Sequence, residues 1–389
     1  MQKHHNGASI IRLVHKQRTI PLIKQHFSIQ SITESLASHP EYDGHEEVVF
    51  CEDSETGLQA LIAIHSTTLG PSLGGSRRWK YSDRNEAVTD VLRLSKGMSY
   101  KHAIAGTRMG GGKAVMIANP EAEKTPALMR AFGRFVDSLE GRYITAEDVG
   151  TSVQDMLSVR EETENVSGLP IEHGGSGDPS PMTAYGTYCG ILASLAWSQG
   201  LDQQDACNSE VVRDRVIAVQ GLGHVGMDLC QQLFASGAKL IVADVNAARV
   251  EEACHQFKAT ALPPDAIATA EADLFAPCAL GGILNTISIP NLGAAIVAGA
   301  ANNQLMDDED GARLHQQEVL YAPDFVINAG GIINIANEKP IYDADKARTQ
   351  TQEISNTLWQ IFQRSRETNR PTSVVADELA RQKLLVVTP

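Results

Sequence analysis

The 389-residue chain is acidic, with a formal net charge of −14, and 42% of its residues are hydrophobic. An acidic surface repels phosphate backbones and anionic lipids, so we expect neither a nucleic-acid nor a membrane partner. No apolar run approaches the roughly 20 residues that cross a bilayer, and the six cysteines are scattered without a C-x-x-C pair. This composition predicts a reduced, cytoplasmic globular protein without disulfides or a metal site.

The beginning of the chain differs in charge from the rest. Basic side chains occur in residues 1–33 without a single acid: Lys3, Arg12, Lys16, Arg18 and Lys24. We interpret residues 1–40 as a basic N-terminal extension without catalytic duty.

Predicted strands and helices alternate in the next part of the chain. LQALIAIH (58–65), KAVMIANP (113–120) and RYITAEDVG (142–150) predict strands, whereas 85–96 and 125–141 predict helices. Such alternation indicates an α/β layer architecture. The glycine- and proline-rich stretch EHGGSGDPSP (172–181) predicts a domain junction, followed by a long helix.

A second unit begins with the predicted strand VIAVQ and continues with GLGHVG, a predicted helix and a second predicted strand ending in Asp244. In this context G-x-G-x-x-G predicts a dinucleotide-binding turn. Gly221 permits the tight turn, Gly223 lets the backbone approach a pyrophosphate, and Gly226 lets the helix pack on the strand. We expect His224 and Val225 to complete this loop. Asp244 should bind the ribose hydroxyls and repel a 2′-phosphate, which favours NAD over NADP.

Three glycines precede Lys113 in MGGGKAV, but Thr107 and Ala114 exclude a phosphate-binding loop of the P-loop kind. A lysine between tight turns and a buried strand is desolvated, and a nearby positive charge favours its neutral form, a candidate general base. We expect the glycines to let substrate and nicotinamide approach the backbone. Lys101 could pair with a carboxylate, and Asp148 could shuttle a proton or orient water.

A series of segments in chain order closely resembles the amino-acid dehydrogenases of the glutamate, leucine, phenylalanine and valine family, most closely its leucine branch. They include GPSLGGSRRW, LSKGMSYKHAIAG, MGGGKAV, GRYITAEDVGT, GDPSPMTAYG, IAVQGLGHVG, AGAANNQL and APDFVINAGGIINIANE. The resemblance implies an α/β catalytic domain with a mixed sheet (41–180), a Rossmann-type NAD domain (181–345) and a cleft between them. It also implies C-terminal helices (346–389) that return to the first domain, and a homo-oligomer, either a dimer or an octamer.

The resemblance also implies roles for individual residues. Lys101 would bind the substrate α-carboxylate, and Lys113 with Asp148 would activate the water that attacks an imine. The other residues implied to border the substrate are Leu73, Gly74, Gly75, Met98, Ala146, Ile332, Ile335 and Asn303, with Thr183 and Asn303 near the cofactor. Ammonia and a 2-oxo acid would be the products.

The apolar pocket positions favour branched-chain amino acids, because β-branched Ile332 and Ile335 narrow the slot around Ala146. Two alternatives stay open: an aromatic amino-acid substrate such as phenylalanine, or a catalytically silent NAD-binding regulator. Arg78 and Arg108 depart from the family pattern, and either could enter the cleft.

Overall fold

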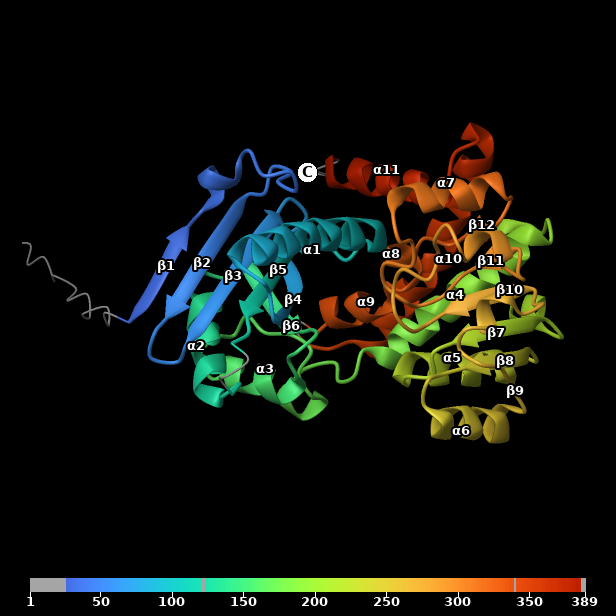
Figure 1. Ribbon diagram of the computed structural model, residues 1–389, viewed down its shortest axis with the longest axis horizontal. Coiled ribbons are helices and arrows are strands. Elements are labelled where there is room, and N and C mark those ends of the chain that lie inside the picture. Colours follow the sequence, from blue (N-terminus) through green and yellow to red (C-terminus); the bar gives the residue numbers. More distant parts are fainter. Residues whose placement is uncertain (1–25, 120–122, 339–340, 386–389) are drawn as a thin grey trace, which may run out of the picture.

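The computed structural model of the chain describes residues 26–119, 123–338 and 341–385. Two six-stranded sheets lie at opposite ends of the molecule, and helices cover and connect them (Figure 1). The predicted α/β architecture with two domains is therefore confirmed. Residues 1–25, most of the predicted basic extension, lie outside the described residues.

The first sheet is mixed, as predicted, and has the strand order β1-β2-β3-β5-β4-β6. Its strands are β1 (Phe27–Ser31), β2 (Glu47–Asp53), β3 (Leu58–Ser66), β4 (Ser72–Trp79), β5 (Gly110–Ile117) and β6 (Tyr143–Glu147). The first four strands in this order pair antiparallel, while β4 runs parallel to both β5 and β6. β4 is thus placed between β5, which carries Lys113, and β6, which ends one residue before Asp148.

Helix α1 (Arg84–Ala105) covers one face of this sheet, and α2 (Pro126–Asp137) with α3 (Val153–Arg160) covers the other. Alternating strand residues face the two layers: Leu61 and Val115 pack with α1, whereas Ile62 packs with α2 and α3. The α1 helix extends well beyond the predicted 85–96. It begins where the Asp83 side chain accepts from the Glu86 amide, and it ends at Gly106, whose φ is 65°.

Strand β4 was not predicted, because its two glycines weaken any strand signal in the local sequence. Tertiary packing requires them. A Cβ on Gly74 would lie 1.8 Å from the Gly112 carbonyl oxygen, and one on Gly75 would lie 2.5 Å from that of Glu147. The backbones of β5 and β6, on either side of β4, therefore require glycine at these two positions.

The second sheet is parallel throughout, with the order β12-β11-β10-β7-β8-β9. Its strands are β7 (Val216–Gln220), β8 (Lys239–Ala243), β9 (Thr260–Ala261), β10 (Leu274–Pro277), β11 (Ile296–Val297) and β12 (Leu320–Tyr321). The accompanying helices are α4 (Ser180–Ser198), α5 (His224–Ala235), α6 (Ala247–Phe257) and α7 (Asp308–Gln316). Ile217 and Val219 face the core formed with α4 and α5, whereas Ala218 faces a second core that includes α7.

The C-terminal part of the described chain is helical: α8 (Asp324–Ile327), α9 (Gly330–Ala336), α10 (Ala344–Thr368) and α11 (Thr372–Leu385). α10 packs along α4, and α11 reaches across to α1 of the first domain (Figure 1). There the Lys383 amine donates to the Ile104 carbonyl oxygen at 3.2 Å. None of the helices in the described ranges is long and apolar enough to cross a bilayer.

Candidate active site

A buried ion pair between Lys113 and Asp148 forms the centre of the candidate site. Lys113 lies within β5 and is 6% exposed, and its Nζ lies 2.9 Å from Asp148 Oδ2. Asp148 directly follows β6, so the pair spans the intervening strand β4. A Cβ on Gly75 would lie 2.9 Å from the Asp148 Cβ. Glycine at this position therefore leaves Asp148 the space to reach Lys113.

The carboxylate of Asp148 is held in its ionised form by its surroundings. Burial acts to raise the pKa of Asp148, but the nearby charges of Lys113 and Arg77 outweigh burial and lower the pKa below its usual value. A carboxylate beside a buried amine can orient and polarise a water molecule for attack. This is general acid–base chemistry of the kind the sequence predicts.

The three glycines before Lys113 are required by the packing of the protein itself. That they also let substrate and nicotinamide approach the backbone stays a prediction. A Cβ on Gly111 would lie 2.1 Å from the backbone nitrogen of Ser99 in α1, and one on Gly112 would lie 2.8 Å from the Tyr143 ring. These glycines bring β5 into direct contact with α1 and β6. Their role is thus to fix the depth of Lys113 below α1.

Lys101 lies on α1 and is partly buried, and its side-chain amine forms no hydrogen bond or ion pair with the described part of the chain. Burial lowers the pKa of Lys101 to about 8; Asp324 in α8 opposes this shift, and Lys113 adds to it. The N–H groups of this amine are free to donate hydrogen bonds to a ligand carboxylate.

The predicted substrate-side residues of the first domain lie around β4. Leu73 is 2% exposed and Ala146 of β6 is 5% exposed, and β4–β6 pairing sets Gly75 opposite Ala146. The Met98 side chain of α1 lies over Gly74, 3.4 Å from where a Cβ would stand. These residues thus lie close to the Lys113–Asp148 ion pair.

Ile332 and Ile335 lie on α9, which belongs to the second domain, and both are partly buried. A link between α9 and the first domain is made by Glu338: its carboxylate accepts from the Gly168 amide at 3.0 Å. A Cβ on Gly168 would in turn lie 3.8 Å from the Ala146 Cβ. The carboxylate of Glu338 thereby holds the end of α9 against the segment that lies beside Ala146.

The glycine-rich loop has the geometry that its motif predicts. Gly221 has φ 94°, a Cβ on Gly226 would lie 1.9 Å from the Gly221 carbonyl oxygen, and nothing stands within 4 Å of a Cβ on Gly223. Gly223 is the N-cap of α5. Open space in front of free helix-terminal amides is a cradle suited to a phosphate.

Asp244 braces this loop, because its Oδ2 accepts from the Leu222 amide at 2.6 Å and its Oδ1 from Asn246 at 2.7 Å. His224 is exposed, with its Nδ1 lying 3.5 Å from Asp178 Oδ2. Val225 packs partly against the core.

Thr183 and Asn303 lie on other elements of the second domain. The Thr183 hydroxyl donates to the Pro179 carbonyl oxygen at 3.0 Å, near the start of α4. Asn303 has φ 51°, and its carbonyl oxygen accepts from the Gly282 amide at 2.7 Å. Among the described residues, neither side chain forms a hydrogen bond with Lys113 or Asp148.

Sequence reasoning missed several polar residues that the fold brings to the site, among them Arg77, Asp90, Asp324 and Glu338. Arg77, Asp324 and Glu338 stand in segments that carry the family resemblance, and Asp90 does not, but none of the four was given a role at the site. Of the two arginines that depart from the family pattern, Arg108 is exposed with φ 58°, while the Arg78 amide donates to the Val149 carbonyl oxygen at 2.9 Å.

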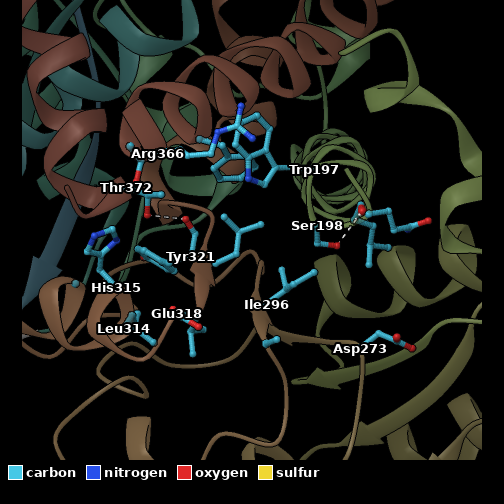
Figure 2. Close-up of a pocket in the computed structure, with 18 of the residues that line it drawn as sticks. Trp197, Ser198, Asp273, Ile296, Leu314, His315, Glu318, Tyr321, Arg366 and Thr372 are labelled. Carbon is cyan, nitrogen blue, oxygen red and sulfur yellow. Dashed lines mark hydrogen bonds between the residues drawn. The ribbon is translucent and has the colours of Figure 1, made fainter. Parts of the chain in front are cut away.

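A cavity of about 1120 Å³ lies away from this site, in the second domain (Figure 2). Among the residues that line it are Trp197, Tyr321 and Arg366, together with Arg215 before β7 and Asp273 before β10. It therefore lies at the amino ends of the parallel strands. Ligands of such sheets bind at the carboxyl ends, where the glycine loop stands, so this cavity is not the dinucleotide site.

Comparisons with known proteins agree with this geometry. Residues 45–165 match the model of the Glu/Leu/Phe/Val dehydrogenase dimerisation domain, and residues 242–370 match the Glutamate/Leucine/Phenylalanine/Valine dehydrogenase model. A leucine dehydrogenase of Geobacillus stearothermophilus is 48% identical over 88% of this chain and 91% of its own. A phenylalanine dehydrogenase of Caldalkalibacillus thermarum is 44% identical over 90% of this chain and 94% of its own.

The same relationship appears in three dimensions. The crystal structure of L-tryptophan dehydrogenase from Nostoc punctiforme superposes with a TM-score of 0.78 at 42% identity, covering 90% of this chain and 98% of that one. The fold and the two family matches define an amino-acid dehydrogenase. The chain belongs to the Glu/Leu/Phe/Val dehydrogenase family.

Proposed function

We propose that the chain catalyses the reversible, NAD-dependent oxidative deamination of a branched-chain L-amino acid, namely leucine, isoleucine or valine. The products are the 2-oxo acid and ammonia. The observation that carries the proposal is the buried Lys113–Asp148 pair, with 2.9 Å between Nζ and Oδ2. The 48% identity to a leucine dehydrogenase supports the substrate class.

The residues of the second domain fit a dinucleotide. Gly223 leaves open space at the start of α5, and Gln220 Oε1, at the carboxyl end of β7, is buried without a hydrogen-bond partner among the described residues. Asp244 stands where ribose hydroxyls would bind, and its negative charge disfavours a 2′-phosphate. The bound cofactor would accept the hydride from the substrate Cα.

In this proposal, Lys101 binds the α-carboxylate and so sets the position of Cα. Loss of the hydride converts the amino acid to an iminium ion. Lys113 takes a proton from a water oriented by Asp148 as the oxygen bonds to the iminium carbon. Lys113 then returns this proton to the nitrogen, and the hydroxyl proton passes to Lys113 as the C=O bond forms and the C–N bond breaks. Ammonia leaves the 2-oxo acid, and Lys113 releases its proton to solvent.

The balance is amino acid, NAD⁺ and water giving 2-oxo acid, ammonium, NADH and one proton. Exclusion of bulk water around Lys113 favours this sequence, because the charges of the site act more strongly in a low-dielectric environment.

Aromatic amino acids are the second candidate substrates. They are favoured by the structural match to L-tryptophan dehydrogenase and by the 44% identity to a phenylalanine dehydrogenase. The small side chain of Ala146 limits the pocket less than a larger residue would. One methylene discriminates by only about 1–3 kcal/mol in an apolar pocket, so direct assay must rank these substrates.

The test is NADH formation with leucine, isoleucine, valine, phenylalanine, tryptophan and glutamate, using the wild-type chain and Lys113→Ala. We expect turnover of the branched-chain acids and a loss of about 10³-fold or more in Lys113→Ala. Lys96→Ala is the matched control, because Lys96 lies on α1 and pairs with Asp43 at 2.9 Å. Turnover confined to aromatic acids would overturn the substrate, and an active Lys113→Ala would overturn the mechanism.

We also propose that the chain forms a homo-oligomer. The model matched by residues 45–165 is described as a dimerisation domain. β1 is an edge strand of the first sheet with mostly exposed residues, and such an edge can take a further strand. Light scattering of the purified chain tests this, with a monomer as the contrary result.

A further inference from the structure

Asp148 has a second cationic neighbour besides Lys113. Arg77 lies on β4, and its Nε donates to Asp148 Oδ2 at 3.2 Å. The same oxygen lies 2.9 Å from Lys113 Nζ. One carboxylate oxygen is thus shared by two cations that approach from neighbouring strands.

Arg77 is itself held in place from the other side. Its Nη1 donates to Asp90 Oδ2 at 3.1 Å and Oδ1 at 3.3 Å, and Asp90 lies on α1. The Tyr81 hydroxyl donates to Asp90 Oδ2 at 2.5 Å. Burial and the bond to Asp90 raise the pKa of Tyr81, so this phenol stays a donor. The planar guanidinium therefore has two carboxylate partners, one toward the site and one away from it.

We propose that Arg77, fixed by Asp90 and Tyr81, is a positioning residue that directs the Asp148 carboxylate toward Lys113 and keeps it ionised during the reaction. This inference rests on the proposed role of the Lys113–Asp148 pair. Arg77 acts through Asp148 and need not touch the substrate.

The charges around Asp148 agree with this role. Burial opposes ionisation of Asp148, and Lys113 followed by Arg77 reverses that effect, so that the pKa is lowered. The other titratable groups that interact with this carboxylate are Lys101 on α1, Glu147 and Tyr143 on β6, and Tyr81 beyond β4. Lys101 is positive at neutral pH but forms no ion pair within the described residues, and the remaining groups are not cations. Arg77 is therefore the partner that can hold the carboxylate while Lys113 exchanges protons.

Arg77→Gln tests the proposal through kcat and the pH–rate profile. We expect kcat to fall by about 10- to 100-fold, with a smaller change in KM, because the carboxylate loses its alignment. The ascending limb of the profile should move to higher pH, because loss of a positive charge makes protonation of the coupled pair easier. A purely structural role would lower stability without moving the limb.

Arg93→Gln is the matched control. Arg93 lies on the same helix as Asp90 and lines the same cavity as Arg77, but its Nη2 pairs with Glu41 at 2.6 Å. This variant removes an equal charge and should leave kcat and the pH profile unchanged.

Two conservative variants separate charge from geometry. Arg77→Lys keeps the charge, so it should restore the position of the limb but only part of kcat. Tyr81→Phe removes one hydroxyl with little risk to folding, and a smaller shift in the same direction is expected. If Lys113→Ala is inactive while Arg77→Gln and Tyr81→Phe match the wild type, the positioning role of Arg77 is overturned and the proposed function stands. If Lys113→Ala is active, the proposed function itself fails.

Discussion

At the scale of single residues, the surroundings of a carboxylate decide in which direction its pKa is shifted. Asp148 and Asp324 are both partly buried, yet their pKa values are shifted in opposite directions. Burial raises the pKa of Asp324, and neighbouring amides and Lys101 offset this only in part. In Asp148 the direct contacts with two cations reverse the effect of burial, so its pKa is lowered. The distance to a cation, rather than burial alone, decides which carboxylate is the stronger acid.

Lys101 should lose its affinity for carboxylates as the pH rises above about 8. Burial lowers the pKa of Lys101 to about 8, so the amine is charged below this pH and neutral above it. Because a bound carboxylate favours the charged form, the Kd of isocaproate should increase about tenfold per pH unit above that point. Isothermal titration calorimetry measures this Kd, and isocaproate avoids titration of a ligand amine.

Lys101→Met provides the control for that measurement, because it removes the titrating group while keeping much of the side-chain volume. Its weaker binding should not change with pH over the same range. A wild-type Kd that stays constant up to about pH 10, near the ordinary pKa of a lysine, would contradict the role of Lys101.

At the scale of elements, the glycines of the glycine-rich loop fall into two kinds. Some are required by the packing of the protein, whereas others leave space for a ligand. Gly226 packs on Gly221, where added atoms would collide with the backbone. Gly223 has φ −68° and ψ −171°, which any residue can adopt, and nothing stands within 4 Å of a Cβ there. The fold alone gives no reason for glycine at position 223.

Gly223→Ala should therefore weaken NAD binding without destabilising the protein. We expect the Kd for NAD⁺ to rise by about tenfold or more, since a methyl group would occupy the space that a pyrophosphate needs, with an unchanged unfolding midpoint. Gly226→Ala should lower that midpoint, at a cost of about 1–3 kcal/mol for overpacking. Fluorescence titration and denaturant unfolding measure the two effects. Unchanged NAD⁺ affinity in Gly223→Ala would place the cofactor elsewhere.

At the scale of the whole molecule, a buried carboxylate connects the two domains. Glu338, 4% exposed, accepts from the Gly168 amide and from both the amide and the hydroxyl of Ser176, at 2.6–3.1 Å. These donors come from the segment between α3 and α4, whereas Glu338 follows α9. Several donors on one carboxylate make this a strong, charge-assisted contact.

Glu338→Gln should destabilise the protein by about 2 kcal/mol, because the amide group presents an NH₂ to donors that need an acceptor. Denaturant unfolding measures the change. Glu353→Gln on α10 is the control, since Glu353 is exposed and its carboxylate accepts from the nearby Asn356 at 2.9 Å. Equal stability of the two variants would show that the interdomain contact contributes nothing.

The sequence predicted the parts of the fold that depend on neighbours along the chain. Helices α1, α2, α4 and α5, strands β3, β5, β6, β7 and β8, and the glycine loop follow from local periodicity and turn chemistry. Boundaries were less accurate: α2 ends at Asp137 rather than Gly141, and β5 begins at Gly110. Strand β4 escaped prediction because contacts distant in sequence override its weak local preference.

By itself the sequence determined the α/β class, the dehydrogenase family and the identity of the lysine and aspartate at the proposed site. Only the tertiary structure decided which partners those residues have. Arg77 and Asp148 are 71 positions apart, and Glu338 and Gly168 are 170 apart. Hydrogen bonds act over about 3 Å, so such partners exist only once strand order and helix packing bring the segments together, and no local pattern encodes that approach.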